Sequence, residues 1–379
     1  MEYTQERVAT LHRLTEAPVG FDGLEPVLER TVVVVPMTDR EQERPAATGV
    51  LSALESIRPA PERVIVPVRA DPDRIESFRV WAESFDLSVQ VLWCNAPAVE
   101  KLLARKELDG DLGKGRDVWL ALGPAIAQGE YVVVHDADAT SFRPDHVVRL
   151  LEPLAMGYDF SKGYYARVED GRLYGRLCRL LYEPLVEAVR ADHDDPVVEY
   201  LAAFRYALAG EFAVTADLAS RLRPPRAWGL EVATLGDAFE HASFEGSAQV
   251  DLGIHRHDHR NVDGDAGLEG MSRDVASSIL RVLEANDVDV DYETLATRYR
   301  TVADRLIDQY AADAAFNDLS YDRDGEREQV TRYARSLTPP KGERRLPPWA
   351  AAPVEPDALV QAATPWTPSA ASLESTTQD

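Results

Sequence analysis

The first half of the chain alternates short apolar runs with amphipathic segments, and this alternation constrains the fold more than any other feature. Residues 31–36 form a short apolar run, and residues 63–66, 88–92 and 131–134 are further strand candidates rich in valine, isoleucine and leucine. Segments with helical periodicity lie between them, and in residues 115–127 apolar side chains recur at spacings of three and four. Strands that alternate with helices predict an α/β fold with a doubly wound, mostly parallel sheet. Such a sheet binds ligands at the carboxyl ends of its strands.

The second half of the chain has a mixed pattern. Residues 172–190 are expected to be helical and residues 249–259 extended. Two amphipathic helices are expected within residues 265–337, which would form a helical C-terminal extension. Residues 338–379 are rich in proline, alanine, serine and threonine. This composition predicts a disordered tail, in which one segment could dock.

The charge balance restricts the possible partners. The chain carries 65 acidic and 41 basic residues, a formal net charge of −24, and only five of the basic residues are lysines. A surface this acidic stays soluble where salt screens its self-repulsion, so a halophilic cytosol is one interpretation. An acidic protein from a GC-rich genome would also use arginine in place of lysine. In either case the negative field disfavours nucleic acid and anionic membranes as partners.

The signals for export and membrane insertion are missing from the sequence. No run of about 18 apolar residues is present, so no helix is expected to span a membrane. The first 18 residues lack the apolar centre of an export signal. Two cysteines, Cys94 and Cys178, are too few for a disulfide framework and fit a reducing compartment. We therefore expect a cytoplasmic protein.

Two carboxylates follow the last of the four apolar runs. Asp136 and Asp138 come within four residues of the end of the run at 131–134. Carboxylates separated by one residue can hold a hard divalent cation against the phosphates of a nucleotide. The cation would offset charge that develops on a leaving diphosphate. The same triplet pattern occurs at residues 192–194 and 287–289, so a solvated turn is the alternative.

A glycine-rich segment opens a predicted helix about 20 residues earlier. Gly113 and Gly115 flank Lys114 there. Glycines let the backbone approach a phosphate closely, the start of a helix favours an anion, and Lys114 adds a positive charge. A glycine-rich turn without a ligand is the alternative.

Three of the eight histidines are His255, His257 and His259. In an extended chain the period of two turns their imidazoles to one side. Imidazole binds borderline divalent metals such as manganese. Two alternatives remain open at this point: a turn without a ligand, and a zinc site of the kind found in metal-dependent hydrolases.

Two further features could serve either a ligand or only the fold. Glu231 begins a predicted helix, where a carboxylate can simply compensate the helix dipole. Arg172, Arg176 and Arg179 are expected on or near one helical face, which suggests an anionic ligand. They could equally pair with acidic side chains nearby.

Taken in order, these segments resemble the retaining glucosyl-3-phosphoglycerate synthases and, more distantly, the mannosyl-3-phosphoglycerate synthases. The resemblance runs over residues 32–273. Six motifs carry it, in the family's order and spacing: Gly113-Lys114-Gly115, Asp136-Ala137-Asp138, Gly175-Arg176 with Pro184, Ala209-Gly210-Glu211-Phe212, Gly229-Leu230-Glu231, and Gln249 to Gly253 followed by His257.

The resemblance implies a GT-A fold and a retaining hexosyltransferase. After an N-terminal segment at 1–30, residues 31–150 would bind the nucleotide sugar and residues 151–264 would bind the acceptor and carry the catalytic groups. The enzyme would move a hexose, glucose in this family, from a nucleoside diphosphate to 3-phosphoglycerate with Mg²⁺ or Mn²⁺. Relatives of this kind are often dimers, so a homodimer is expected.

The resemblance also implies roles for individual residues. Asp138 and His257 match the metal ligands, and Lys114, Asp138 and Glu231 match the catalytic groups. The donor would contact Pro36, Met37, Thr38, Asp39, Arg40, Lys114, Asp136, Ala137, Trp228, Gly229, Leu230 and Glu231. The acceptor would contact Gly175, Arg176, Leu177, Cys178 and His259. No carboxylate matches a covalent nucleophile, so a front-face route is expected.

Several positions depart from the family's pattern. The loop at residues 36–40 lacks the usual Pro-X-X-Asn-Glu sequence, and residues 66–71 lack the usual acidic, serine-containing loop. Both would touch the nucleotide, which leaves GDP-mannose open as the donor. Cys178 replaces a threonine and His259 an asparagine, which leaves another small acceptor open. A zinc hydrolase and a non-catalytic sugar-nucleotide-binding protein are the rivals of another class.

Overall fold

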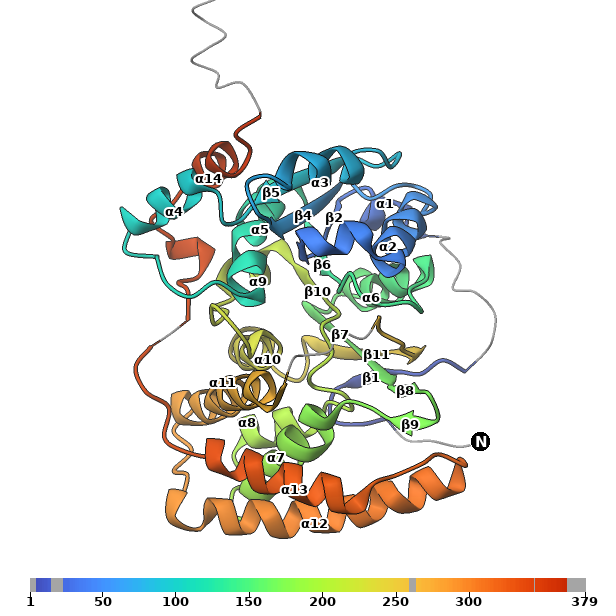
Figure 1. Cartoon of the computed structure of the whole chain (residues 1–379), viewed down its shortest axis with the longest axis vertical. Coiled ribbons are helices and arrows are strands. Elements are labelled where there is room, and N and C mark those ends of the chain that lie inside the picture. Colours follow the sequence, from blue (N-terminus) through green and yellow to red (C-terminus); the bar gives the residue numbers. More distant parts are fainter. Residues whose placement is uncertain (1–4, 15–22, 259–263, 344, 367–379) are drawn as a thin grey trace, which may run out of the picture.

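The computed structural model describes residues 5–14, 23–258, 264–343 and 345–366 (Figure 1). One nine-stranded sheet runs through the molecule in the order β1-β11-β7-β10-β6-β2-β4-β3, with β5 also paired to β4. Its strands are β1 (Ala9–Leu11), β2 (Thr31–Val34), β3 (Met37–Thr38), β4 (Arg63–Arg69), β5 (Val89–Trp93), β6 (Tyr131–Val134), β7 (Phe160–Ala166), β10 (Phe212–Thr215) and β11 (Ser247–Ile254). A separate hairpin consists of β8 (Val168–Glu169) and β9 (Arg172–Leu173).

The first half of the chain builds the parallel part of the sheet, as predicted. Val33 of β2 lies between Val64 of β4 and Val133 of β6, and all three are buried. Strands covered on both faces read as continuous apolar runs, which is why the pattern was visible in the sequence. The helices of this half are α1 (Glu25–Leu28), α2 (Pro45–Glu55), α3 (Ile75–Ala82), α4 (Pro97–Ala104), α5 (Lys114–Gln128) and α6 (Pro144–Ala155).

Strands from the second half extend the same sheet. β10 runs antiparallel to β6 on one side and to β7 on the other, and β11 and β1 lie parallel beyond β7. The sequence does not predict β7 or β10. β7 buries Ser161 and Lys162, so it is neither an apolar run nor a clean alternation, and β10 is only 4 residues long.

The helix predicted for residues 172–190 is wrong in its first part. The chain forms β9 and then reaches Gly175, whose φ is +80°. This left-handed conformation, which suits glycine, interrupts the expected helical face. A π-helical turn (Cys178–Tyr182) then leads into α7 (Glu183–Arg190). Arg179 is buried and forms two 2.8 Å hydrogen bonds with Glu326, whereas Arg176 is exposed.

Helices cover the lower end of the molecule in Figure 1. Two long ones, α11 (Gly264–Ala285) and α12 (Tyr292–Phe316), occupy the region where amphipathic helices are predicted. α12 buries Leu295, Tyr299, Ala303 and Ile307 at spacings of four, which is one face of a helix. The remaining helices of this half are α8 (Pro196–Ala202), α9 (Ala216–Arg221), α10 (Leu230–His241) and α13 (Arg323–Tyr333). None of the described helices has the length and apolarity that a membrane crossing requires.

The prediction of a disordered tail is wrong for residues 345–366, which we call the C-terminal strap. The strap buries Trp349 and ends in α14 (Pro356–Ala363), which packs on α4 and α5. The ring of Trp349 stacks on Trp119 of α5 with centroids 4.6 Å apart. The indole N–H of Trp349 donates to the Trp119 carbonyl at 2.7 Å. The composition predicted disorder, but a few buried side chains hold this otherwise polar segment in place. Residues 367–379 lie outside the described part of the chain.

Candidate active site

One cluster joins a lysine to two carboxylates from three separate elements. Lys114 begins α5, Asp136 lies two residues beyond β6, and Glu231 lies in the first turn of α10. The Lys114 ammonium is 2.7 Å from Asp136 Oδ1 and 3.1 Å from Glu231 Oε1. Burial lowers the pKa of Lys114, but the charges of the two carboxylates outweigh burial and raise it. Burial likewise opposes the charge of Asp136, yet Lys114 holds the pKa of Asp136 below its usual value.

Gly115 allows this cluster to form because residues 225–227 cross directly over the start of α5. A Cβ at this position would lie 1.9 Å from the Pro225 carbonyl oxygen. The Arg116 amide donates to a carbonyl of the same segment at 2.9 Å. The neighbour that these glycines admit is the protein's own chain, and their contact with a phosphate stays a prediction. Lys114 places a positive charge at this helix start.

A second pair is assembled by backbone contact between the segment after β6 and the segment after β11. The Asp258 amide donates to the Asp138 carbonyl at 2.7 Å, and Ala139 lies opposite His257 in an antiparallel bridge. Asp138 and His257, far apart in the sequence, thus become neighbours. The His257 amide also donates to Glu169 Oε1 at 3.1 Å, which ties this segment to the β8–β9 hairpin.

The chemistry of this pair fits a hard divalent cation. Burial and the charge of Asp136 raise the pKa of Asp138 to about 7, and burial and Arg167 lower the pKa of His257 to about 3. A neutral imidazole and a carboxylate that a nearby cation would stabilise are suitable ligands. His257 Nδ1 is buried, and among the described residues it has no hydrogen-bond partner. Mg²⁺ and Mn²⁺ are commonly held by one or two side chains together with substrate phosphates.

The three-histidine zinc site receives no support from the described part of the chain. His259 lies outside the described residues. His255 is fully buried and stacks on Tyr165, with ring centroids 4.1 Å apart. The described residues contain no group of three or more His, Cys, Asp or Glu side chains arranged to hold a metal ion.

Two further buried charged residues received no role from the sequence. Glu211 is fully buried, with Oε1 3.6 Å from His255 Nε2 and 4.0 Å from His135 Nε2. Lys162 of β7 is also buried and donates to the Ala209 carbonyl. Burial lowers the pKa of Lys162 to about 8 against the charges of Glu231 and Glu211. The scarcity of lysine in this chain was the signal that could have drawn attention to Lys162.

The predicted nucleotide loop lies at the carboxyl ends of β2 and β4. Residues 36–40 include β3 and the start of a tight turn (Asp39–Glu43). Asp39 is buried, and its Oδ2 accepts from the Asp71 amide at 2.9 Å. Glu41 Oε2 accepts from the Thr38 amide at 2.8 Å. The two loops that depart from the family's pattern therefore contact each other.

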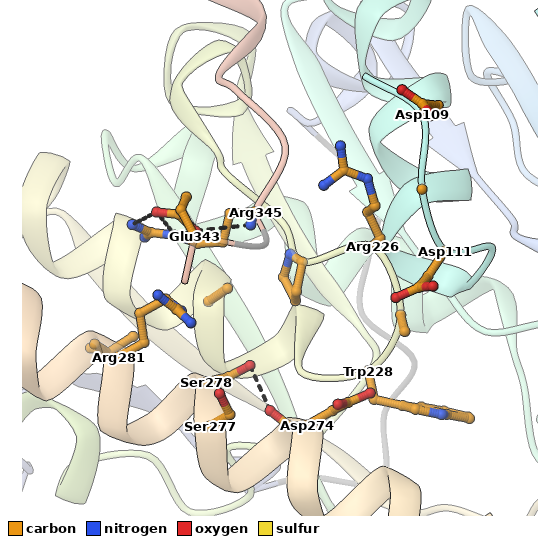
Figure 2. Close-up of a pocket in the computed structure, with 15 residues that line it drawn as sticks. Asp109, Asp111, Arg226, Trp228, Asp274, Ser277, Ser278, Arg281, Glu343 and Arg345 are labelled. Carbon is orange, nitrogen blue, oxygen red and sulfur yellow. Dashed lines mark hydrogen bonds and ion pairs between the residues drawn. The ribbon is translucent and has the colours of Figure 1, made fainter. Parts of the chain in front are cut away.

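The predicted sugar segment, residues 228–231, leads from an exposed tryptophan into α10. Trp228 is 45% exposed, and Gly229 has a φ of +98° with Ser278 packed against it. Leu230 is buried. A pocket of ≈ 240 Å³ borders Trp228 from the side of α11 (Figure 2). Its lining mixes arginines with acidic side chains and includes neither Lys114 nor the metal pair, so it is separate from the candidate active site.

The predicted acceptor segment is only partly accessible. Arg176 is exposed and Leu177 half-buried. Gly175 lies against the Tyr206 hydroxyl, which would be 2.5 Å from a Cβ there. Cys178 of the π-helical turn is buried, and its Sγ lies 4.0 Å from Glu183 Oε1 of α7. Burial raises the pKa of its thiol. The structure thus turns the Cys178 side chain into the core.

Comparison with known proteins gives a consistent result. No protein-family model matches the chain. It is 30% identical to the glucosyl-3-phosphoglycerate synthase of Methanococcoides burtonii, over 89% of this chain and 88% of the relative. The enzyme of the same name from Persephonella marina is 32% identical, over 81% of this chain and 80% of the relative.

Solved structures of the synthase from Mycobacterium tuberculosis share the fold. One, in complex with Mn²⁺, UDP-glucose and phosphoglyceric acid, matches with a TM-score of 0.57 and 24% identity, over 73% of this chain and 88% of that one. The complex with Mn²⁺, UDP and phosphoglyceric acid matches with a TM-score of 0.55 and 25% identity, over 73% of this chain and 86% of that one. The sheet with its helices has the GT-A architecture that the sequence predicts. This chain belongs to the glucosyl-3-phosphoglycerate synthase family.

Proposed function

We propose that the chain transfers glucose from UDP-glucose to the hydroxyl of 3-phosphoglycerate, with Mg²⁺ or Mn²⁺ and with retention at the anomeric carbon. The observation that carries this proposal is the pairing of Asp138 with His257 beside the Lys114–Glu231 contact. The named activity of relatives that match most of the chain supports it.

Each group near the donor has a role that its surroundings favour. Asp138 and His257 would hold the divalent cation, which supplies positive charge against the charge that develops on the leaving diphosphate. Lys114 would contact the same diphosphate, since two carboxylates keep it protonated and fixed in place. Glu231, oriented by Lys114, would accept hydrogen bonds from the sugar hydroxyls. Residues 36–40, Asp136 and Ala137 would bind the nucleotide, and residues 228–230 the sugar.

The reaction fits a front-face route. The bond from the anomeric carbon to the β-phosphate oxygen breaks, and a bond to the acceptor oxygen forms on the same face. The proton of the acceptor hydroxyl passes to the departing phosphate oxygen. A double displacement needs a free carboxylate nucleophile. Asp136 and Glu231 are poor candidates for this role because both are paired with Lys114.

Arg176 would hold an anionic group of the acceptor, together with the backbone of residues 175–178. It lies in the segment where the family binds the acceptor, and it is the exposed arginine there. Its neighbour Arg179 is already paired with Glu326 and has no role in this proposal. His259 would be a further acceptor contact.

A donor and acceptor screen tests the proposed function. UDP-glucose, GDP-mannose and GDP-glucose are each incubated with 3-phosphoglycerate and Mn²⁺ in molar KCl. Nucleoside diphosphate release and product mass are then measured. We expect turnover with UDP-glucose to exceed the others, and none after chelation of the metal. Preferred use of GDP-mannose would overturn the nucleotide assignment, and no transfer with any donor would overturn the enzyme.

We further infer that the protein works in a salt-rich cytoplasm as a homodimer. The excess of 65 acidic over 41 basic residues supports the salt-rich cytoplasm. The homodimer is expected because relatives of this kind are often dimers. Sedimentation equilibrium in 0.1 M and about 2 M KCl tests the assembly. A monomer in both buffers would contradict the dimer.

A further inference from the structure

Arg167 lies between the metal pair and the acceptor segment. It follows the last residue of β7 directly. Its guanidinium Nη2 is 3.9 Å from Glu169 Oε1, the oxygen that accepts the His257 amide at 3.1 Å. The side chain therefore reaches the edge of the metal pair.

The other side of Arg167 faces the acceptor segment through Tyr206. The guanidinium interacts with the Tyr206 hydroxyl. The same hydroxyl packs so closely on Gly175 that a Cβ there would be 2.5 Å away. The Tyr174 amide donates to the Arg167 carbonyl at 2.9 Å. Arg167 and the segment that begins at Gly175 are thus held together by one tyrosine and by the backbone.

The protein leaves part of this guanidinium without a partner. The contact to Glu169 is too long for a hydrogen bond. The Nε atom is buried and, in the part of the chain that the structure describes, has no hydrogen-bond partner. Arg179 offers a contrast, because its Nη1 and Nη2 each donate to Glu326 at 2.8 Å and its Nε donates to the Tyr174 carbonyl at 3.1 Å. A buried donor left unpaired is costly, so an anion bound beside Arg167 would offset this cost. Its side chain is 22% exposed, which leaves an edge for one.

We propose that Arg167 is a second anchor for the acceptor and binds its carboxylate, while Arg176 binds its phosphate. The proposal rests on the proposed function. In 3-phosphoglycerate the reacting hydroxyl sits on the carbon bonded to the carboxylate, and the phosphate lies one carbon farther away. The anion nearest to the reacting oxygen should therefore meet the arginine nearest to the metal pair. A planar guanidinium also matches a carboxylate in a two-bond fork.

Three acceptors separate the roles of the two arginines. They are 3-phosphoglycerate, glycerol 3-phosphate, which lacks the carboxylate, and glycerate, which lacks the phosphate. Arg167→Gln should raise KM for 3-phosphoglycerate about 10- to 100-fold, the loss expected for hydrogen bonds to a charged group. It should leave KM for glycerol 3-phosphate and for UDP-glucose unchanged. Arg176→Gln should weaken both phosphorylated acceptors and leave glycerate unaffected.

Each outcome of this experiment bears on the proposal. Equal losses for 3-phosphoglycerate and glycerol 3-phosphate in Arg167→Gln would overturn it, as would an unchanged KM for 3-phosphoglycerate. Arg167→Lys, which keeps the charge but not the fork, should show a smaller, still carboxylate-specific loss, and this variant serves if Arg167→Gln does not fold. UDP binding with Mn²⁺ verifies that the donor site is intact. Absence of transfer to 3-phosphoglycerate by the wild type is a separate result that would overturn the proposed function and this inference together.

Discussion

The backbone pairing of their segments brings Asp138 and His257 together, so either side chain can be replaced without removing that pairing. We expect Asp138→Asn and His257→Ala each to lower Mn²⁺-dependent turnover by at least about 100-fold, because a missing ligand removes several kcal/mol of charge stabilisation. Steady-state kinetics and calorimetric titration of Mn²⁺ with UDP provide the measurement.

A matched control lies in another Asp-X-Asp triplet of the same chain. Asp194 is exposed and lies outside every segment assigned to the site. Asp194→Asn should therefore behave as the wild type. Near-normal turnover by Asp138→Asn and His257→Ala would contradict their assignment as metal ligands.

Asp237 is expected to make stability depend on pH. It is buried in α10, where its Oδ2 accepts from the Arg223 amide at 2.6 Å. Burial outweighs this contact and raises the pKa of Asp237 from 3.8 to about 7. The folded protein thus keeps a proton that the unfolded chain loses above about pH 4. The associated stability is present below that pH and is lost as pH rises through 7.

Asp237→Asn replaces the titrating carboxyl with a neutral amide and tests this link between pH and stability. The free energy of unfolding of the variant, relative to wild type, should rise by about 2–4 kcal/mol between pH 5 and pH 8. Urea unfolding at both pH values measures it, with exposed Asp217→Asn as the control. Parallel pH profiles for wild type and Asp237→Asn would show that the group is not protonated in the folded state.

At the scale of elements, the contact between Lys114 and Glu231 depends on the segment 225–227, which crosses the start of α5 and leads into α10. Gly115→Ala places a Cβ 1.9 Å from the Pro225 oxygen, so the segment must move. We expect at least about a tenfold loss of kcat/KM for UDP-glucose, the effect of a small misplacement of catalytic groups. Gly49→Ala in α2 is the control, because a Cβ there meets nothing within 4 Å. It should retain full activity and gain about 0.5–1 kcal/mol. Equal activity of both variants would contradict this account.

The C-terminal strap is expected to stabilise the donor side of the molecule. Besides the Trp349–Trp119 stack, the Leu346 amide donates to the Pro224 carbonyl at 2.9 Å, next to the crossing segment. Trp349→Ala should cost about 3–5 kcal/mol of stability and raise KM for UDP-glucose. Phe316→Ala is the control, because Phe316 is 88% exposed and should change stability by under about 0.5 kcal/mol. Thermal unfolding and donor kinetics measure both variants. A Trp349→Ala variant as stable as Phe316→Ala would contradict the strap's role.

The elements that could be predicted are those whose side chains repeat with a clear period. β2 and β6 are buried on both faces and read as apolar runs, so the sequence places Asp136 and Asp138 at a strand end. β7 could not be recognised, since it buries Lys162 beside Glu211, and a buried charge looks like a surface residue in a sequence. The order of the C-terminal strap could not be predicted either, because its composition is typical of disorder and the stacking of Trp349 on Trp119 cannot be read from composition.

The site shows the same division between local and long-range information. Lys114, Asp136, Glu231 and His257 were each identified from local motifs and from the family resemblance. Their meeting depends on two crossings that no local pattern contains, one at Gly115 and one between the segments of Asp138 and His257. The sequence does not indicate a role for Arg167, because that role depends on contacts with Glu169 and Tyr206 that form only in the folded chain.

For the molecule as a whole, a net charge of −24 makes self-repulsion a major contribution to the free energy of unfolding. Screening shortens the range of this repulsion from about 10 Å at 0.1 M salt to about 3 Å at 1 M. We therefore expect the midpoint of thermal unfolding to rise steadily from 0.1 to about 2 M KCl, even though the arginine–carboxylate pairs on the surface weaken over the same range. Sucrose at equal osmolality is the control, because it strengthens burial without screening charge. An equal rise in sucrose would assign the effect to burial, and a fall in KCl would mean that surface ion pairs outweigh the excess negative charge.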